Sequence, residues 1–177
     1  AVQGLVLGLA GANAQKVVLI TRELAVTGDE RAYVGTVSGS GASQAVAWGS
    51  GTVWLSGQVR SGSRQMSCAY DSNAQKIAIN YARDSDSYCY GLVGTVSGSS
   101  ISFGTATAYL SSASYACASV YDSTAQKVVF AFKDNNDDSA AIVGTISGTG
   151  ISFGTAATIG TTNMNEAQRL AYDPDQN

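Results

Sequence analysis

The chain has 177 residues and a formal net charge of −3. Charged residues make up 13% of it, about half the share that is usual in globular proteins, whereas hydrophobic residues reach an ordinary 45%. This hydrophobic content excludes wholesale disorder, and without a Lys/Arg cluster we expect no nucleic-acid partner. The low charge favours β structure in an extracellular or particle-bound setting.

The N-terminal stretch 1–15 is apolar and looks a little like the core of a signal sequence. It lacks a basic region, however, and its end carries a motif that returns later in the chain. We therefore predict a strand over Val2–Ala10 rather than a targeting segment. No apolar run of about 18 residues occurs, so we expect no membrane span.

Three motifs recur along the chain. Ala-Gln-Lys stands at 14–16, 74–76 and 125–127, Val-Gly-Thr-(Val/Ile)-Ser-Gly stands at 34–39, 93–98 and 143–148, and Tyr-Asp stands at 70–71, 121–122 and 172–173. The last two units repeat at about 50 residues, in the range of propeller blades. The first unit is longer, because 40–63 reads as an insertion.

The repeats divide the chain into four parts. A divergent first repeat with an insertion covers 1–64, and the second and third repeats cover 65–113 and 114–164. The first strand of an incomplete fourth repeat lies in 165–177. We expect that last strand at about Glu166–Tyr172.

Each full unit is predicted to contain four short strands. In the third unit the β-branched and aromatic runs bounded by turn residues indicate strands at Tyr115–Tyr121, Lys127–Lys133, Ala140–Ser147 and Ile151–Ile159. Gly148 to Gly150 is a hairpin signal, and Gly144 and Gly154 indicate bulges or a close backbone approach.

The expected fold is all-β, made of four-stranded antiparallel meander repeats of about 50 residues, β-propeller-like, with about three blades plus one strand. A β-solenoid and a sandwich are the alternatives. A closed ring takes four to eight blades. The chain would therefore be a fragment, close with other copies of itself, or pair its last strand with a neighbouring subunit.

The string YDSTAQKVVFAFKD…AIVGTISGTGISFGTA resembles repeats of large phage and cyanobacterial surface proteins, which read Tyr-Asp, four residues, Lys-Val-Val, a loop and Ile-Val-Gly-Thr-Val-Ser-Gly-x-x-Ile-Ser-Phe-Gly. The resemblance covers about 65–160. It implies a tail-fibre or adhesin-like array on a virion or cell surface. The turn is also similar to the Asp-box of sialidase-like propellers, but lacks its Gly and Trp, so sialidase activity is not implied.

The chain has no histidine, which excludes Ser/His/Asp and Cys/His nucleophile systems and leaves only the rarer Ser-Lys forms. For the same reason we expect no zinc site. Asp71, Asp122 and Asp173 occupy one repeat position. Such equivalence favours a structural turn role over a catalytic pair, which needs unequal environments. We therefore predict that the protein is not an enzyme.

A second group of polar residues lies in the loop after 133. Asp134, Asn136 and Asp138 alternate there and offer oxygen ligands for Ca²⁺, but the loop lacks the Gly and Glu of an EF-hand. We favour a solvated acidic turn and predict no cofactor. Asp134 and Asn136 remain candidates for ligand binding.

Aromatic residues form the third candidate group. Tyr88 and Tyr90 flank Cys89 near a loop, and Trp48 and Trp54 lie in the 40–63 segment. Exposed Tyr and Trp side chains stack on sugars and anchor interfaces. The spacing of Trp48 and Trp54 puts both on one face of a strand, which favours packing.

Cys68 and Cys117 precede the Tyr-Asp pairs of their units and are expected on the same face of equivalent strands. A disulfide between them is one interpretation. The other, which we favour, is that the cysteines, Cys89 included, are small buried thiols.

Together these features suggest a non-enzymatic β-repeat module on the outside of a virion or cell. It would serve in attachment, with a cell-surface glycan as partner. The alternative is a structural subunit of a fibre or filament, assembled from copies of itself by pairing of strands between subunits.

Overall fold

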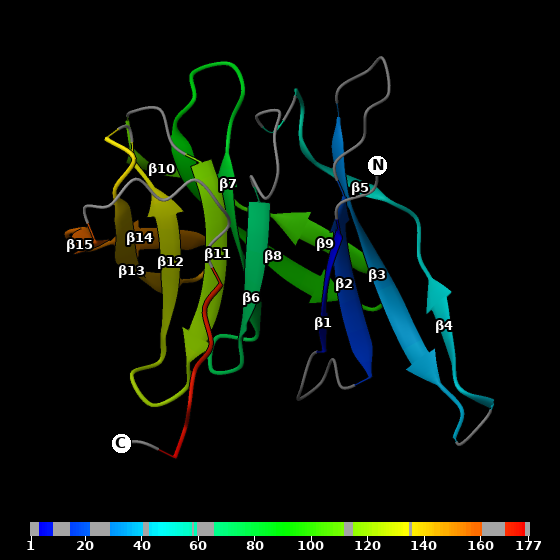
Figure 1. Ribbon diagram of the computed structural model, residues 1–177. Coiled ribbons are helices and arrows are strands. Elements are labelled where there is room, and N and C mark those ends of the chain that lie inside the picture. The colour runs from blue at the N-terminus through cyan, green and yellow to red at the C-terminus, as the bar shows by residue number, and fades with distance from the viewer. Residues whose placement is uncertain are drawn as a thin grey trace.

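The computed structural model describes residues 4–8, 15–21, 29–40, 43–57, 59, 66–111, 115–134, 136–160 and 169–175. Its regular elements are strands, arranged in three antiparallel sheets of five strands each (Figure 1). Within these residues no sheet closes on itself. The predicted all-β class is confirmed. Among the same residues there is no helix long and apolar enough to cross a membrane.

The first sheet has the strand order β1-β2-β3-β4, and β5 also pairs with β3. Its strands are β1 (Gly4–Gly8), β2 (Lys16–Thr21), β3 (Glu30–Ser38), β4 (Ala45–Trp48) and β5 (Thr52–Leu55). β1 falls within the strand expected at Val2–Ala10, whose other residues lie outside the described part. The segment 40–63, expected to be an insertion, contains β4 and β5 and so contributes two strands to the sheet.

The second and third sheets repeat this order. The second contains β6 (Met66–Asp71), β7 (Lys76–Ala82), β8 (Cys89–Ser97), β9 (Ser100–Phe103) and β10 (Thr107–Leu110). The third contains β11 (Tyr115–Asp122), β12 (Lys127–Lys133), β13 (Ser139–Ser147), β14 (Gly150–Phe153) and β15 (Ala157–Gly160).

The predicted fourth strand of each unit is two short strands. In the third sheet, β14 and β15 pair with different parts of the same strand, β13. The chain makes one more hydrogen bond, from the Gly154 N–H to the Val143 carbonyl at 3.0 Å, and then leaves the edge of the sheet. The prediction of one strand over Ile151–Ile159 is therefore wrong, because the backbone leaves β13 after Gly154 and returns at Ala157.

The turn after the first strand is built in the same way in the second and third sheets. Oδ1 of Asp71 accepts hydrogen bonds from the N–H groups two and three residues ahead, at 2.9 and 2.8 Å, and Oδ1 of Asp122 does the same at the same distances. Gln75 and Gln126 close these turns with φ values of 55° and 54°. The sequence did not single out these glutamines, although each belongs to an Ala-Gln-Lys motif.

The sheets lie side by side, and each buries a face against the next (Figure 1). One core lies between the first two sheets and includes Val18, Ile20, Ile77 and Ile79. A second joins the second and third sheets through residues that include Val93, Phe130 and Phe132. Apolar burial of this kind stabilises the arrangement by about 25 cal/mol per Å².

One buried polar side chain crosses the second of these interfaces. Asn80 on β7 is fully buried, and its Nδ2 donates to the carbonyl of Ala118 on β11 at 3.1 Å. Its Oδ1 accepts a hydrogen bond from the Tyr109 hydroxyl at 2.7 Å. A buried amide satisfied in this way fixes how two sheets sit against each other, because sliding would leave its polar atoms unpaired.

All three cysteines are buried free thiols, which is the interpretation that the sequence favoured. Cys68 pairs with Ile79 in the core of the first two sheets, whereas Cys117 packs in a separate cluster with Cys89. The interpretation of a Cys68–Cys117 disulfide is therefore wrong. The strand alternation on which it depended is interrupted by an irregular register between Tyr115 and Ala118.

Candidate functional site

The loop between β7 and β8 gathers four of the more polar and aromatic side chains of the second sheet. The Tyr88 carbonyl accepts a hydrogen bond from the Arg83 N–H at 3.0 Å, and Oδ1 of Asp86 accepts one from the Tyr88 N–H at 3.1 Å. Ser87 adopts a φ of 63°, which turns the chain back toward β8. The loop is thus closed by its own backbone and by one carboxylate.

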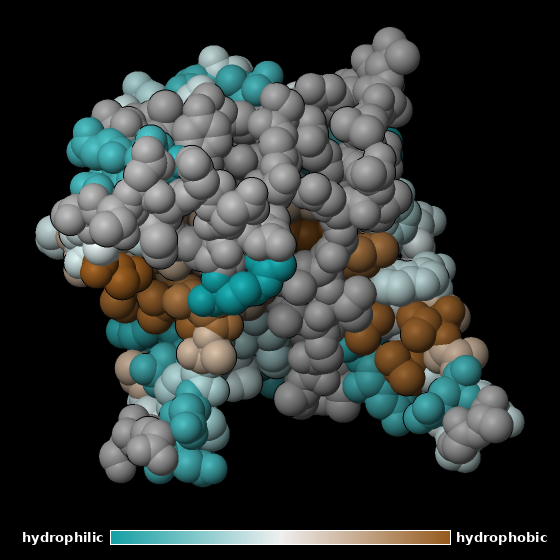
Figure 2. Space-filling view, in the orientation of Figure 1, coloured by the Kyte–Doolittle hydropathy of each residue, from teal (hydrophilic) through white to brown (hydrophobic). Residues whose placement is uncertain are grey.

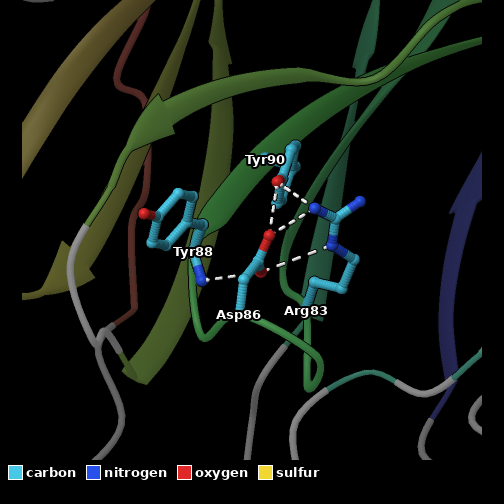
Figure 3. A network of polar contacts seen from close by, with 4 residues as sticks. All are labelled: Arg83, Asp86, Tyr88 and Tyr90. Atoms are coloured by element: carbon cyan, nitrogen blue, oxygen red, sulfur yellow. Dashed lines mark hydrogen bonds and ion pairs between the residues drawn. The ribbon is translucent and has the colours of Figure 1, made fainter.

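Arg83, Asp86 and Tyr90 form a closed network (Figure 3). The Arg83 guanidinium donates to both Asp86 and the Tyr90 hydroxyl, and that hydroxyl donates to Oδ2 of Asp86 at 2.8 Å. The guanidinium carbon also lies 4.2 Å from the centre of the Tyr90 ring. The hydrogen bonds from Arg83 lower the pKa of Asp86 to about 2, so its carboxylate stays ionised.

The Tyr90 ring of this network packs against further aromatic side chains. The Tyr90 ring stacks on Tyr81 at 5.5 Å between ring centres, and Tyr81 meets Trp54 edge-on at 5.0 Å. Tyr90 and Trp54 are 8% and 7% exposed, so little of either ring faces solvent. The Tyr88 ring points away from the network (Figure 3) and is half-buried.

The predicted site residues fall into separate places. Tyr88 lies in the loop between β7 and β8, and Tyr90 lies two residues further on, in β8. Trp54 contacts Tyr81, on which Tyr90 stacks. Asp134 and Asn136 lie in the loop between β12 and β13, in another sheet. No sequence motif pointed to Arg83 or Asp86, although their separation of three residues in one loop suits an ion pair.

Trp48 and Trp54 lie on different strands, and their exposures differ. Trp48 ends β4 and is 46% exposed, whereas Trp54 is in β5 and belongs to the core between the first two sheets. The prediction that both share one face of a strand is wrong, because the chain leaves β3 between β4 and β5.

In the loop with Asp134, the carboxylate serves the loop itself. Its Oδ1 accepts hydrogen bonds from the N–H groups of Asn136 and Asp138, at 2.9 and 3.0 Å. Asp137 pairs with Lys133 at 2.6 Å. The part of the chain that the structure describes contains no group of three or more His, Cys, Asp or Glu side chains suited to a metal ion.

The outward face of the third sheet is a second candidate site. Val93 on β8 pairs with Ala78, and Val143 on β13 pairs with Val129, in the same register. Val93 is fully buried under the third sheet, but Val143 is 46% exposed. We call Val129, Val143, Gly154 and Ile159 the C-terminal face.

The bulges in β5, β10 and β15 show the same difference in exposure between the covered sheets and the third sheet. Trp54, Tyr109 and Ile159 each sit where the pairing of that strand shifts register. Trp54 packs on Tyr81 of the second sheet, and Tyr109 packs on Phe130, Phe132 and Phe153 of the third. Ile159 is 64% exposed, and the described residues form no further sheet beside it.

Two glycines lie where a hairpin of the following sheet makes a close backbone contact with the preceding sheet. A Cβ on Gly49 would collide with the Ser99 backbone, and one on Gly104 would collide with the Thr149 backbone. Ser99 and Thr149 lie in the β8–β9 and β13–β14 hairpins. The corresponding Gly154 has room, since its nearest neighbour would be the Val143 carbonyl oxygen at 3.9 Å.

The opposite end of the molecule carries the complementary surface. Val17, Val46 and Trp48 gather around Gly35 of β3, as Val128, Ile151 and Phe153 gather around Gly144 of β13. The second set packs on the second sheet, whereas Val46 and Trp48 are 43% and 46% exposed. We call Val17, Val46 and Trp48 the N-terminal face. Figure 2 shows hydrophobic surface at both ends, over β3–β4 and over β13–β15.

The C-terminal segment 169–175 lies against the third sheet. The Tyr172 hydroxyl is 2.6 Å from Oγ1 of Thr124, in the turn held by Asp122. Tyr121 contacts the turn of the second sheet in a similar way, with a hydrogen bond to Asp71. Asp173 also holds a turn, since its Oδ1 accepts the Asp175 N–H at 2.9 Å. The strand expected at Glu166–Tyr172 falls partly on this segment. No strand pairing occurs within the described residues 169–175, and residues 166–168 lie outside the described part.

Comparison with protein-family models, with curated proteins and with solved structures found no match.

Proposed function

We propose that this chain is a structural, non-enzymatic repeat module whose ends join to further copies of the chain, head to tail. The observation that carries the proposal is the exposure of Val143 at a position where the equivalent Val93 is covered by the next sheet. Exposed apolar patches often mark interaction sites, and here the equivalent position in the neighbouring sheet is already used as a packing surface.

The proposed partner is the N-terminal face of a second copy. Within the chain, Val128, Ile151 and Phe153 cover Ala78, Val93 and Tyr109. Val17, Val46 and Trp48 have the arrangement of the covering set, and Val129, Val143 and Ile159 correspond to the covered set. The junction between copies therefore continues the packing already present inside each copy.

Residues 169–175 have a defined part in this junction. Tyr172 already contacts the Asp122 turn, the counterpart of the turn that Tyr121 contacts. Within one copy, β1 lies beside β2. In a head-to-tail junction, residues 169–175 of one copy would lie beside β2 of the next copy, in the place of that copy's own β1. An exchange of the first strand then accompanies assembly, which is a known route to oligomers.

When two different faces of a protein bind each other, each added copy leaves a free face for the next. The series ends only if the rotation between successive copies brings the last copy back to the first. Head-to-tail stacking therefore gives either a ring, in which three sheets per copy form part of a propeller-like array, or an open fibre. The low share of charged residues suits a place outside the cell or on a virion, which we include in the proposal.

Sedimentation velocity over a concentration series tests this function. The wild-type chain is expected to associate, and Val143→Asp to weaken association on the order of 100-fold, because a charge would be buried in an apolar contact. Asn136→Asp is the matched control, since it adds the same charge in an exposed loop. A wild-type chain that stays monomeric throughout, or an equal effect of both variants, would refute the proposal.

A second candidate function is attachment to a glycan at the loop between β7 and β8. The observation that favours it is that Arg83 and Asp86 keep 35% and 26% of their side chains exposed beside the half-buried Tyr88. Charged hydrogen-bonding groups next to an aromatic ring are a common arrangement for sugar recognition.

Tyr88→Ala is the suitable test variant for attachment. Tyr90→Ala would remove a buried ring from the network and so confuse folding with binding. On a glycan array, binding by the wild-type chain that is lost in folded Tyr88→Ala supports attachment. An array with no bound glycan, or binding that the variant retains, removes this candidate.

A further inference from the structure

Cys89 and Cys117 lie together at the boundary between the second and third sheets. Cys89 begins β8 and Cys117 lies in β11, and their exposures are 0% and 3%. With Ala82 they form a small buried cluster that Tyr109 and Leu110 cover. A hydrogen bond joins the two thiols.

Two irregularities in the sheets help to bring these side chains together. The pairing of β10 with β8 shifts register just before Leu110 meets Cys89. The pairing of β11 with β12 shifts between Tyr115 and Ala118, where Ala116 has a φ of 56°. Bulges of this kind re-aim a side chain, and a non-glycine residue in the left-handed region is uncommon.

We propose that Cys89 and Cys117 form a disulfide that links the second sheet to the third. This inference is independent of the proposed head-to-tail assembly. Cys68 takes no part, because it packs in the core between the first and second sheets.

The bond would form by exchange with a small-molecule disulfide such as oxidised glutathione. One cysteine loses its proton and attacks the glutathione disulfide, which releases one reduced glutathione and leaves a mixed disulfide. The second cysteine loses its proton and displaces the other glutathione, so two electrons pass to glutathione in all. The hydrogen bond with Cys89 and, after it, burial raise the pKa of the Cys117 thiol, so exchange is expected before the sheets have packed.

Peptide mapping after refolding tests the inference. The unfolded, reduced chain is refolded in a mixture of reduced and oxidised glutathione, and remaining thiols are alkylated before digestion without a reducing agent. The expected product joins the Cys89 peptide to the Cys117 peptide and lacks two hydrogen atoms, while Cys68 is alkylated. Both Cys89 and Cys117 recovered as alkylated thiols, or a bond to Cys68, would overturn the inference.

The third cysteine supplies the matched control. Cys68→Ala is expected to leave the bond intact, whereas Cys89→Ala and Cys117→Ala should each yield no disulfide-linked peptide, with the remaining partner and Cys68 both alkylated. If these variants do not fold, the wild-type chain alone decides, because the oxidised form should have a higher midpoint of urea unfolding than the same chain after reduction. Equal midpoints for the bonded and reduced chains would contradict a bond that fits the native packing.

Discussion

Val93 and Val143 occupy the same register position in neighbouring sheets, yet Val93 is fully buried and Val143 is 46% exposed. The same difference separates Tyr109 from Ile159, and Gly104 from Gly154. In each pair the first residue is covered by the third sheet. Val143, Ile159 and Gly154 all belong to the C-terminal face, which no sheet covers within the described residues.

The glycine pair offers a comparison within one chain. Gly104→Ala is expected to destabilise the fold by on the order of 1–3 kcal/mol, because the new Cβ would collide with the Thr149 backbone. Gly154→Ala is expected to leave the free energy of unfolding nearly unchanged, because the site has room. Urea unfolding of the two variants measures the difference. Under the proposed assembly, Gly154→Ala should also weaken association. Equal costs in stability would mean that Gly104 does not seat the hairpin.

Asn80 should be among the more sensitive polar positions of the molecule. Asn80→Ala leaves the buried Tyr109 hydroxyl and the Ala118 carbonyl without this partner, at a cost of about 2–3 kcal/mol. Thermal unfolding measures the loss. Asn73→Ala, at an exposed turn position, is the control and should change the melting temperature little. Similar losses in both variants would argue against an organising role for the buried amide.

The hydrogen bonds to Asp86 predict an acid-dependent loss of stability. The pKa of Asp86 is lowered from 3.8 to about 2 in the folded chain, so its contribution is present above about pH 4 and is lost as the pH falls through about 2. Asp86→Asn should therefore be less stable than the wild-type chain at about pH 5, with the gap closing near pH 2. Urea unfolding at both pH values measures this. Asp84→Asn, in the same loop, leaves the Arg83–Asp86 pair intact and serves as the control.

The turn glutamines carry a backbone cost that glycine would relieve. Gln126 has a φ of 54°, and left-handed geometry costs a non-glycine residue roughly 1–2 kcal/mol. Gln126→Gly should therefore raise the free energy of unfolding by about 0.5–1 kcal/mol, in spite of the flexibility that glycine adds to the unfolded chain. The neighbouring Lys127→Gly, within β12, should instead destabilise. A loss of stability in both variants would contradict the left-handed turn.

Much of the fold follows from local patterns in the sequence. The alternating and β-branched runs at 115–121, 127–133 and 140–147 predict β11, β12 and β13 almost to their ends. The break between β14 and β15 was missed, because Gly154 to Ala156 does not interrupt the apolar pattern strongly. The bulge at Ala116 was missed as well, since a left-handed alanine has no sequence signature.

The candidate sites were harder to predict, because exposure depends on which sheet lies beside which. Trp48 and Trp54 look alike in sequence, but one lies on an uncovered face and the other in a core. Val93 and Val143 lie in nearly identical strings, Leu-Val-Gly-Thr and Ile-Val-Gly-Thr, and their difference arises only from the packing of the next sheet. The association of Arg83 with Asp86 and Tyr90 depends on the conformation of one loop.

Cysteine cross-linking between two separately made variants tests head-to-tail assembly most directly. The ring centres of Tyr109 and Phe153 lie 5.0 Å apart at the junction between the second and third sheets. Between copies, the counterparts of these two residues are Ile159 and Trp48. A mixture of Ile159→Cys and Trp48→Cys chains should give a mixed disulfide dimer on oxidation, in excess over dimers of either variant with itself. If the mixed dimer is no more abundant than that formed when Asn136→Cys replaces Trp48→Cys, the two ends do not meet and the proposed assembly is wrong.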